Sequence, residues 1–242
     1  MCRHFAYLGP RAPLQQLVFD APHSLAMQSY APRRQGHGTV NVDGFGAGWY
    51  VDGHRRPVRY RRAQPIWSDQ SFASLAPTVE SGCVLAAVRS ATPGYPADES
   101  CAAPFTHEGW LFSHNGCVFD SQALRKTLQD RVSWVPDALA AVDSAFMFGL
   151  AVTHWSGGAS LGAGLASTVT DVAAAADGRL TTLATDGSLL AGTTWGEPLY
   201  VRRTTDAVVL AAEPDDDGAD WEEVPDRTLV EADRTGVHLT SL

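Results

Sequence analysis

The chain contains few of the residues that build disulfide frameworks or polyanion-binding surfaces. Only four of its 242 residues are cysteine, and no two of them stand at the C-x-x-C spacing typical of zinc or redox sites. Lys126 is the only lysine, and the formal net charge of -9 argues against general binding to polyanions. We therefore expect reduced thiols in a cytoplasmic protein, no nucleic-acid partner, no metal and no other cofactor.

Long apolar runs are also missing. One uncharged stretch, residues 144–170, is interrupted by His154-Trp155-Ser156-Gly157-Gly158. Each half is too short to cross a bilayer, so we expect a pair of buried helices and no membrane span. Polar and basic residues within the first few positions argue against a signal peptide.

The motifs of common nucleotide-binding and metal-dependent enzymes are absent as well. The glycine-rich residues 41–50 depart from G-x-G-x-x-G, because Trp49 occupies the third glycine position. There is no G-x-S-x-G, H-E-x-x-H or G-K-[ST] motif, and the histidines show no metal-ligand spacing. Residues 41–50 are better explained as a tight turn leading into a strand packed against the N-terminal strand.

Hydrophobic periodicity predicts strands, then a central pair of helices, then strands only. The first part has expected strands at residues 2–8, 46–51, 84–88 and 110–113 and expected helices at residues 71–79 and 121–129. The central helices are expected at residues 143–153 and 161–176, and the last strands at 180–185, 189–192, 199–203, 208–212, 229–232 and 237–240. This order, without repeats or a long linker, predicts one α+β domain over residues 1–242, with helices packed on antiparallel sheets.

Cys2 directly follows the initiator methionine. We expect Met1 to be removed because the next side chain is small, which would leave Cys2 with a free α-amino group. That amine has a pKa of ~8, close to the ~8.5 of the thiol, so one residue would hold both a nucleophile and its base. Taken alone, the position is more typical of an ordinary surface or first-strand cysteine.

Three further features are each open to a functional or a structural interpretation. His114-Asn115-Gly116 could supply an oxyanion hole from the Asn115 amide and the Gly116 N–H, or form a plain Asn-Gly hairpin turn. Arg89 follows an apolar strand and could bind a carboxylate bidentately or close a strand-end salt bridge. Asp143 begins the expected central helix and could bind an ammonium group or act as the helix N-cap.

Together, an ordered set of short motifs resembles the class II glutamine amidotransferases over essentially the whole chain. The set consists of Cys2, residues 41–50, residues 88–92, His114-Asn115-Gly116 and Asp143-Ser144. This resemblance implies a four-layer αββα N-terminal nucleophile hydrolase fold of antiparallel sheets.

The resemblance also implies roles for individual residues. Cys2 would be the nucleophile and its own amine the base, and Asn115 with the Gly116 N–H would form the oxyanion hole. Arg89, together with Thr92, would bind the carboxylate of a small-molecule γ-glutamyl substrate. Asp143 would bind the ammonium group of the same substrate.

The opening Met1-Cys2-Arg3-His4 and the stretch Pro22-His23-Ser24-Leu25 more specifically resemble stand-alone amidohydrolases of ergothioneine biosynthesis. That resemblance implies cleavage of γ-glutamyl-hercynylcysteine sulfoxide to glutamate and hercynylcysteine sulfoxide. Ser90, Pro93 and Ala103 depart from other family members and weaken the case for a glutamine-specific lid and ammonia transfer. Three alternatives stay open: the glutaminase subunit of a two-protein amidotransferase, a hydrolase of other γ-glutamyl compounds such as glutathione derivatives, and an inactive glutamyl-binding module.

The leaving-group side is expected in residues 55–67, which are rich in arginine and aromatic residues. Tyr60 or Trp67 could hold a trimethylammonium group by cation–π attraction, or these rings could simply pack in the core. The basic residues 55–62 alternate in a way that predicts a strand with one solvated face. The sequence leaves the oligomeric state open.

Overall fold

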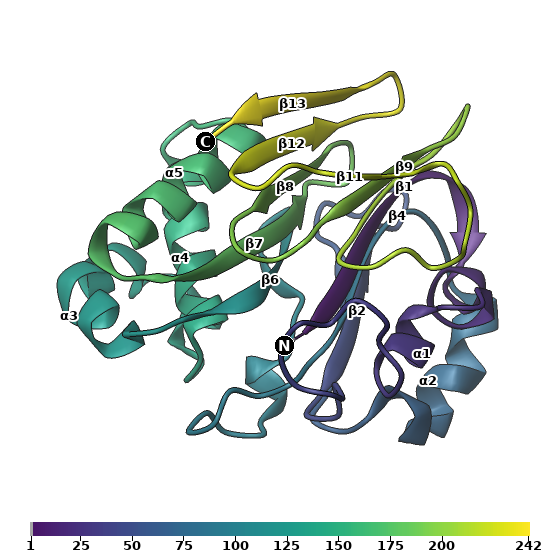
Figure 1. Ribbon diagram of the computed structural model, residues 1–242, viewed down its shortest axis with the longest axis horizontal. Coiled ribbons are helices and arrows are strands. Elements are labelled where there is room, and N and C mark those ends of the chain that lie inside the picture. Colours follow the sequence, from purple (N-terminus) through teal and green to yellow (C-terminus); the bar gives the residue numbers. More distant parts are fainter. Residues whose placement is uncertain (1) are drawn as a thin grey trace.

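The structure, a computed structural model, describes residues 2–242; Met1, whose removal we expect, lies outside the described residues. Two antiparallel sheets lie face to face (Figure 1). The first contains β1 (Arg3–Pro13), β2 (Phe45–Trp49), β3 (Val58–Arg62), β4 (Glu80–Val88), β9 (Tyr200–Arg203), β10 (Val208–Ala211) and β11 (Trp221–Glu223). The second contains β5 (Phe105–His107), β6 (Trp110–Val118), β7 (Gly178–Thr185), β8 (Leu190–Thr194), β12 (Thr228–Ala232) and β13 (Val237–Ser241). The strand orders are β11-β9-β10-β1-β4-β2-β3 and β13-β12-β8-β7-β6-β5.

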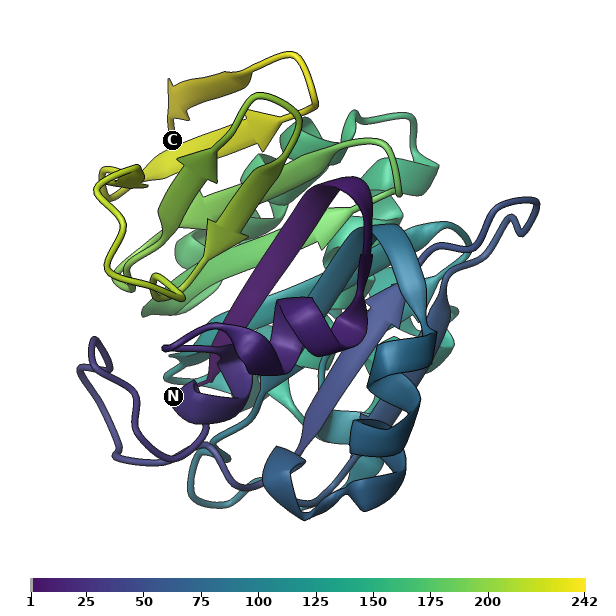
Figure 2. The same cartoon turned by 90° about the vertical axis from the view of Figure 1, so that its right-hand side faces the viewer.

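Helices cover the outer face of each sheet. The second sheet carries α3 (Ser121–Val132), α4 (Asp143–Ser156) and α5 (Leu161–Ala175), and the first carries α1 (Leu25–Gln28) and α2 (Gln70–Leu75), which Figure 2 shows in front of it. Shorter helical turns are η1 (Gln16–Asp20), η2 (Ile66–Ser68), η3 (Ala76–Thr78), η4 (Glu99–Cys101) and η5 (Pro136–Leu139). The layers are helix, sheet, sheet and helix, which confirms the expected αββα arrangement of an α+β protein.

Strand alternation divides the core into layers. Successive side chains of a strand point to opposite faces of its sheet. In β1, Phe5 and Tyr7 therefore pack with the residues beneath α1 and α2, whereas Ala6 and Leu8 pack between the two sheets. A third cluster lies between the second sheet and α3–α5. Because β1 is central and apolar on both faces, its N-terminal end is held firmly inside the molecule.

The central helices follow from their sequence. Most of α4 is buried, because it lies between β6 and the helices α3 and α5. Ser160 caps α5 by accepting from the Ala163 N–H, and Asp120 caps α3 by accepting from the Ala123 N–H. The three helices expected over residues 121–176 are confirmed, with ends that differ by at most a turn. In the described part of the chain, no helix is long and apolar enough to cross a membrane.

Three expectations about strands are wrong. β1 does not end at Gly9-Pro10 but continues to Pro13, with a shift in its pairing between Leu8 and Ala12 that accommodates the glycine and proline. β6 does not end at Ser113 but continues to Val118, because β7 pairs along that whole length. β2 does not lie beside β1, since β4 pairs with both and separates them. The basic run does form an edge strand, β3, as expected.

Candidate active site

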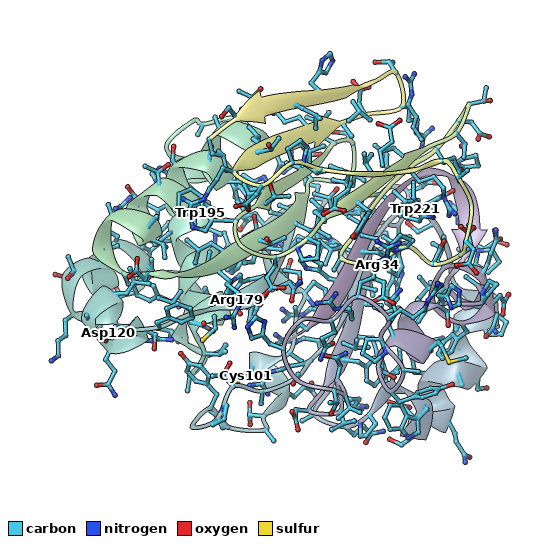
Figure 3. The ribbon with its side chains drawn as sticks, in the orientation of Figure 1. Arg34, Cys101, Asp120, Arg179, Trp195 and Trp221 are labelled. Carbon is cyan, nitrogen blue, oxygen red and sulfur yellow. The ribbon has the colours of Figure 1, made fainter. Side chains whose placement is uncertain are left out.

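A pocket lies where the start of β1, the ends of β4 and β6 and the start of α4 meet. Five of the six residues proposed from the sequence line it: Cys2, Arg89, Thr92, Gly116 and Asp143. Its other lining residues are Ala87, Ser90, Tyr95, Cys101, Ala103, Phe105, Ser113, His114, Val142 and Ser144. Figure 3 labels Cys101, which lines the pocket, and Arg179 of β7, which contacts His114 at its border. The sheet topology thus gathers segments that are far apart in sequence.

Cys2 precedes the first paired residue of β1. Its side chain is half-buried, and its Sγ lies 3.9 Å from the carbonyl oxygen of Ser90. Its own carbonyl oxygen accepts a hydrogen bond of 2.8 Å from Nε of Arg3. The nucleophile candidate therefore stands at the end of a rigid strand, with its thiol open to the pocket.

The other cysteines have different surroundings. All four cysteines are free thiols. Burial raises the pKa of Cys83 to about 12, and that thiol lies in the core beside Thr185. Burial also raises the pKa of the half-buried Cys117 thiol.

Among residues 2–242, no group of three or more His, Cys, Asp or Glu side chains is arranged to hold a metal ion.

Asn115 and Gly116 lie within β6, opposite Thr181 and Leu180 of β7, so the hairpin-turn alternative is wrong. The Leu180 N–H donates to Trp195 on the β8 side. In an antiparallel ladder, the Gly116 N–H then points away from β7 toward the open edge of β6. A Cβ at position 116 would lie 1.9 Å from the Arg179 carbonyl oxygen, so the close approach of β7 requires glycine here.

The Asn115 side chain does not line the pocket surface but is fully buried. Within residues 2–242, neither its Oδ1 nor its Nδ2 has a hydrogen-bond partner. Buried amides are normally paired, so an unpaired one beside a pocket suits the binding of a polar group that enters from outside. Asn115 and Ser113 share one face of β6, because residues two apart in a strand point the same way.

Two buried histidines support this region. His114 Nε2 lies 2.8 Å from the Arg179 carbonyl and therefore donates to it, and its Nδ1 accepts from the Ser144 hydroxyl at 2.9 Å. Burial lowers the pKa of both His4 and His114, so both rings are neutral. His4 Nδ1 lies 2.9 Å from the Ser113 hydroxyl, which links the two sheets beside Cys2.

The sequence did not indicate a role for the hydroxyls of Ser113 and Ser144. Ser113 and Ser144 both line the pocket and each contacts a buried histidine. The signal that could have found Ser113 is its alternation with Asn115, which was hidden because the strand was expected to end at residue 113.

Arg89 is 6% exposed and carries a cation that is only partly satisfied. Its Nη1 donates to the carbonyls of Asp43 and Pro96, at 3.3 and 3.0 Å, and its buried Nη2 has no partner in the described chain. No carboxylate of residues 2–242 lies within 4.0 Å of it, so the strand-end salt bridge is not formed. A buried guanidinium with a spare N–H group is well suited to an incoming carboxylate.

Asp143 is 4% exposed and is the first residue of α4. Its carboxylate accepts from the backbone N–H groups of Val118 and Ser144, both at 2.8 Å. The N-cap position belongs to Val142, so the N-cap interpretation of Asp143 is wrong. Its carboxylate forms no ion pair within residues 2–242, which leaves this buried anion available for an ammonium group.

None of residues 55–67 lines this pocket, so its geometry gives no support to their expected contact with the leaving group. Tyr60 packs in the core against Phe45 and Phe72, with ring centroids 6.0 and 5.1 Å away, and its hydroxyl donates to Asp69. Trp67 is 48% exposed and meets another surface ring, Tyr30, edge to face. The core-packing alternative is therefore correct for Tyr60.

The fold and the pocket define an N-terminal nucleophile hydrolase of the glutamine amidotransferase type. The family described as class II glutamine amidotransferases matches residues 13–217, and the chain belongs to this family. Among solved structures, glutamine phosphoribosylpyrophosphate amidotransferase from B. subtilis gives a TM-score of 0.72 at 17% identity, covering 99% of this chain and 49% of that one. A class-II domain protein from Silicibacter pomeroyi gives 0.73 at 22% identity and 99% coverage of both chains.

Curated proteins similar to the chain carry names more specific than that of the family. The gamma-glutamyl-hercynylcysteine sulfoxide hydrolase of Mycobacterium tuberculosis (strain CDC 1551 / Oshkosh) is 46% identical over 243 residues, which cover 100% of this chain and 97% of the relative. The protein of the same name from Mycolicibacterium smegmatis is 46% identical over 244 residues and covers 100% of both chains. A probable glutamine amidotransferase of Saccharomyces cerevisiae is 29% identical over 142 residues, 54% of this chain and 39% of the relative.

Proposed function

We propose that the protein is a γ-glutamyl amidohydrolase that uses Cys2 as an N-terminal nucleophile, and that its substrate is γ-glutamyl-hercynylcysteine sulfoxide. The observation that carries the reaction class is one pocket lined by the Cys2 thiol, by a cation and an anion that form no ion pair within the described residues, and by Gly116. The substrate is proposed from the full-length relatives at 46% identity that carry this name. Its products are glutamate and hercynylcysteine sulfoxide.

The glutamyl group supplies the charges that the pocket lacks. Its α-carboxylate pairs with Arg89, whose Nη2 has no partner among residues 2–242, and the Thr92 hydroxyl assists. Its α-ammonium pairs with the Asp143 carboxylate, which already accepts two backbone N–H groups and is fixed in orientation. Because Arg89 and Asp143 are both buried, a substrate that lacks the carboxylate or the ammonium would leave one of them as an unpaired buried ion and would bind poorly.

Acylation then proceeds without another basic side chain. After removal of Met1, the α-amine of Cys2 takes the proton of the thiol, and the sulfur attacks the γ-carbonyl carbon. The oxyanion that forms accepts from the Asn115 amide and the Gly116 N–H. The Cys2 ammonium returns its proton to the departing nitrogen, the C–N bond breaks, and a γ-glutamyl thioester remains.

Water completes the turnover. The Cys2 amine takes a proton from a water molecule, and the hydroxide attacks the thioester carbonyl. Collapse of this second tetrahedral intermediate breaks the C–S bond and releases glutamate, and the thiolate recovers its proton. No redox step and no cofactor enter this sequence.

We also propose one domain over residues 1–242, because one cluster of the core contains residues of both sheets and joins them. A cytoplasmic site of action is proposed as well, since all four cysteines are free thiols, as expected in a reducing compartment.

Labelling with an electrophilic glutamine analogue tests the nucleophile. The analogue should modify Cys2 and spare Cys83, Cys101 and Cys117, as measured by peptide mass mapping. Cys2→Ala should fold, resist labelling and release no glutamate. Labelling at a different cysteine, or near-normal turnover by Cys2→Ala, would overturn the assignment.

A further inference from the structure

We propose that Arg3 is a positioning residue for the nucleophile, and that its buried guanidinium holds the carbonyl of Cys2 and thereby the position of the Cα that carries the Cys2 amine and thiol. Glu213 in turn holds Arg3 in place. The inference rests on the proposed function, because it concerns the amine that serves there as the base.

Arg3 is completely buried, although arginine side chains usually lie at the protein surface. Arg3 is the first residue of β1 and its side chain is fully buried. Its Nε donates to the Cys2 carbonyl at 2.8 Å, and its Nη1 donates to the Ala212 carbonyl at 3.4 Å. An arginine is rarely buried completely unless its cation has a partner. Here two backbone carbonyls and the Glu213 carboxylate surround the guanidinium.

The carbonyl of Cys2 helps to place the Cα that carries its amine and thiol. A peptide unit is planar, so each residue has only two soft backbone torsions. Once Met1 is removed, rotation about the Cα–C bond of Cys2 sets the direction of both its amine and its side chain. Cys2 itself lies outside β1, so strand pairing does not hold its backbone directly. Rotation about Cα–C leaves the carbonyl oxygen in place, so the hydrogen bond from Arg3 holds the peptide plane and with it the position of the Cys2 Cα, from which the amine and the thiol extend.

Glu213 provides the counter-charge. Its carboxylate is buried, and its Oε2 lies 3.9 Å from Nη1 of Arg3. The same carboxylate accepts from the backbone N–H groups of Arg33 and Arg34, at 2.7 and 2.9 Å. The Arg34 side chain, labelled in Figure 3, continues to the Tyr200 hydroxyl at 3.1 Å. Glu213 thus connects the loop at Arg33 and Arg34 to Arg3.

A second arginine offers a matched control. Arg202 of β9 is also largely buried, is paired with Asp215 and Asp216, and stacks on Trp221 at 4.5 Å. Neither its hydrogen bonds nor its ion pairs involve Cys2. A loss of charge at Arg202 should therefore lower stability without changing the chemistry at Cys2.

The experiment measures kcat and KM for glutamate release, together with thermal unfolding, for wild type, Arg3→Met, Arg3→Lys, Glu213→Gln and Arg202→Met. We expect Arg3→Met to lower kcat at least about tenfold, the effect of losing one charge-assisted hydrogen bond, with KM changed less than about twofold. Arg3→Lys, which keeps a donor, should recover part of kcat. Glu213→Gln should lower kcat less than Arg3→Met, and Arg202→Met should keep kcat although it unfolds at a lower temperature.

Several results would overturn the inference. Wild-type kcat in folded Arg3→Met would do so, as would wild-type kcat in Glu213→Gln for the role of Glu213. Equal loss of kcat in Arg3→Met and Arg202→Met would mean a purely structural role. If Arg3→Met fails to fold, Arg3→Lys decides: a wild-type kcat there contradicts the inference and a reduced kcat at unchanged KM supports it. An inactive wild type would instead overturn the proposed function, and this inference with it.

Discussion

Replacing Arg89 by lysine tests how the pocket would bind the glutamyl carboxylate. The substitution keeps the positive charge but removes the planar fork. In the wild type, Nη1 is occupied by the carbonyls of Asp43 and Pro96, and Nη2 remains for the substrate. A single ammonium cannot reach both carbonyls and also bind a carboxylate through two parallel bonds.

The expected loss follows from that geometry. A hydrogen bond to a charged group contributes about 1.5–3 kcal/mol, so Arg89→Lys should raise KM roughly ten- to a hundredfold. Steady-state glutamate release measures it, with Arg234→Lys as the control. Arg234 also donates to a backbone carbonyl, that of Gly9, but it does not line the pocket and should keep a wild-type KM. A wild-type KM in folded Arg89→Lys would refute the role of Arg89.

Three further predictions concern the remaining site and its stability. Asp143→Asn should raise KM by roughly ten- to a hundredfold because the substrate ammonium loses its only carboxylate partner; an unchanged KM in steady-state assays would contradict it. Gly116→Ala should unfold at a lower temperature and lose activity, since its Cβ would lie 1.9 Å from the Arg179 oxygen, whereas Gly36→Ala, with no atom within 4 Å, should behave as wild type in the same melting and activity assays. Burial lowers the folded-state pKa of His4 and His114, so protons bind the unfolded chain first, and the free energy of unfolding should fall as pH drops below their ordinary value of 6.5. Denaturant titrations between pH 8 and about pH 5.5 measure this, and a flat profile there would contradict neutral buried rings.

The fold could be predicted further from the sequence than the site could. The α4–α5 pair was evident because an uncharged stretch is divided by residues 154–158, and tertiary packing left that signal intact. The sequence indicated a possible oxyanion hole at Asn115 and Gly116 but placed them after the end of a strand, since Asn-Gly is a strong local turn signal. Pairing with β7 overrides that signal, and no local pattern reveals it.

The rest of the site depends on contacts between distant segments. The burial of Arg3 against Ala212 and Glu213 joins segments about two hundred residues apart, so the sequence shows only an ordinary arginine in the first strand. For Tyr60 the sequence left contact with the leaving group and core packing both open, because its direction depends on how β3 pairs with β2, and that register places its ring against Phe72. Side-chain direction in an edge strand is fixed by pairing, which one sequence does not specify.

The most direct test of the central claim is glutamate release from three substrates by protein whose loss of Met1 has been verified by intact mass. The substrates are γ-glutamyl-hercynylcysteine sulfoxide, glutamine and glutathione. We predict the highest kcat/KM for the sulfoxide, and no release by Cys2→Ala with any substrate. A preference for glutamine would contradict the assignment and favour a glutaminase subunit, and release by Cys2→Ala would contradict the nucleophile itself.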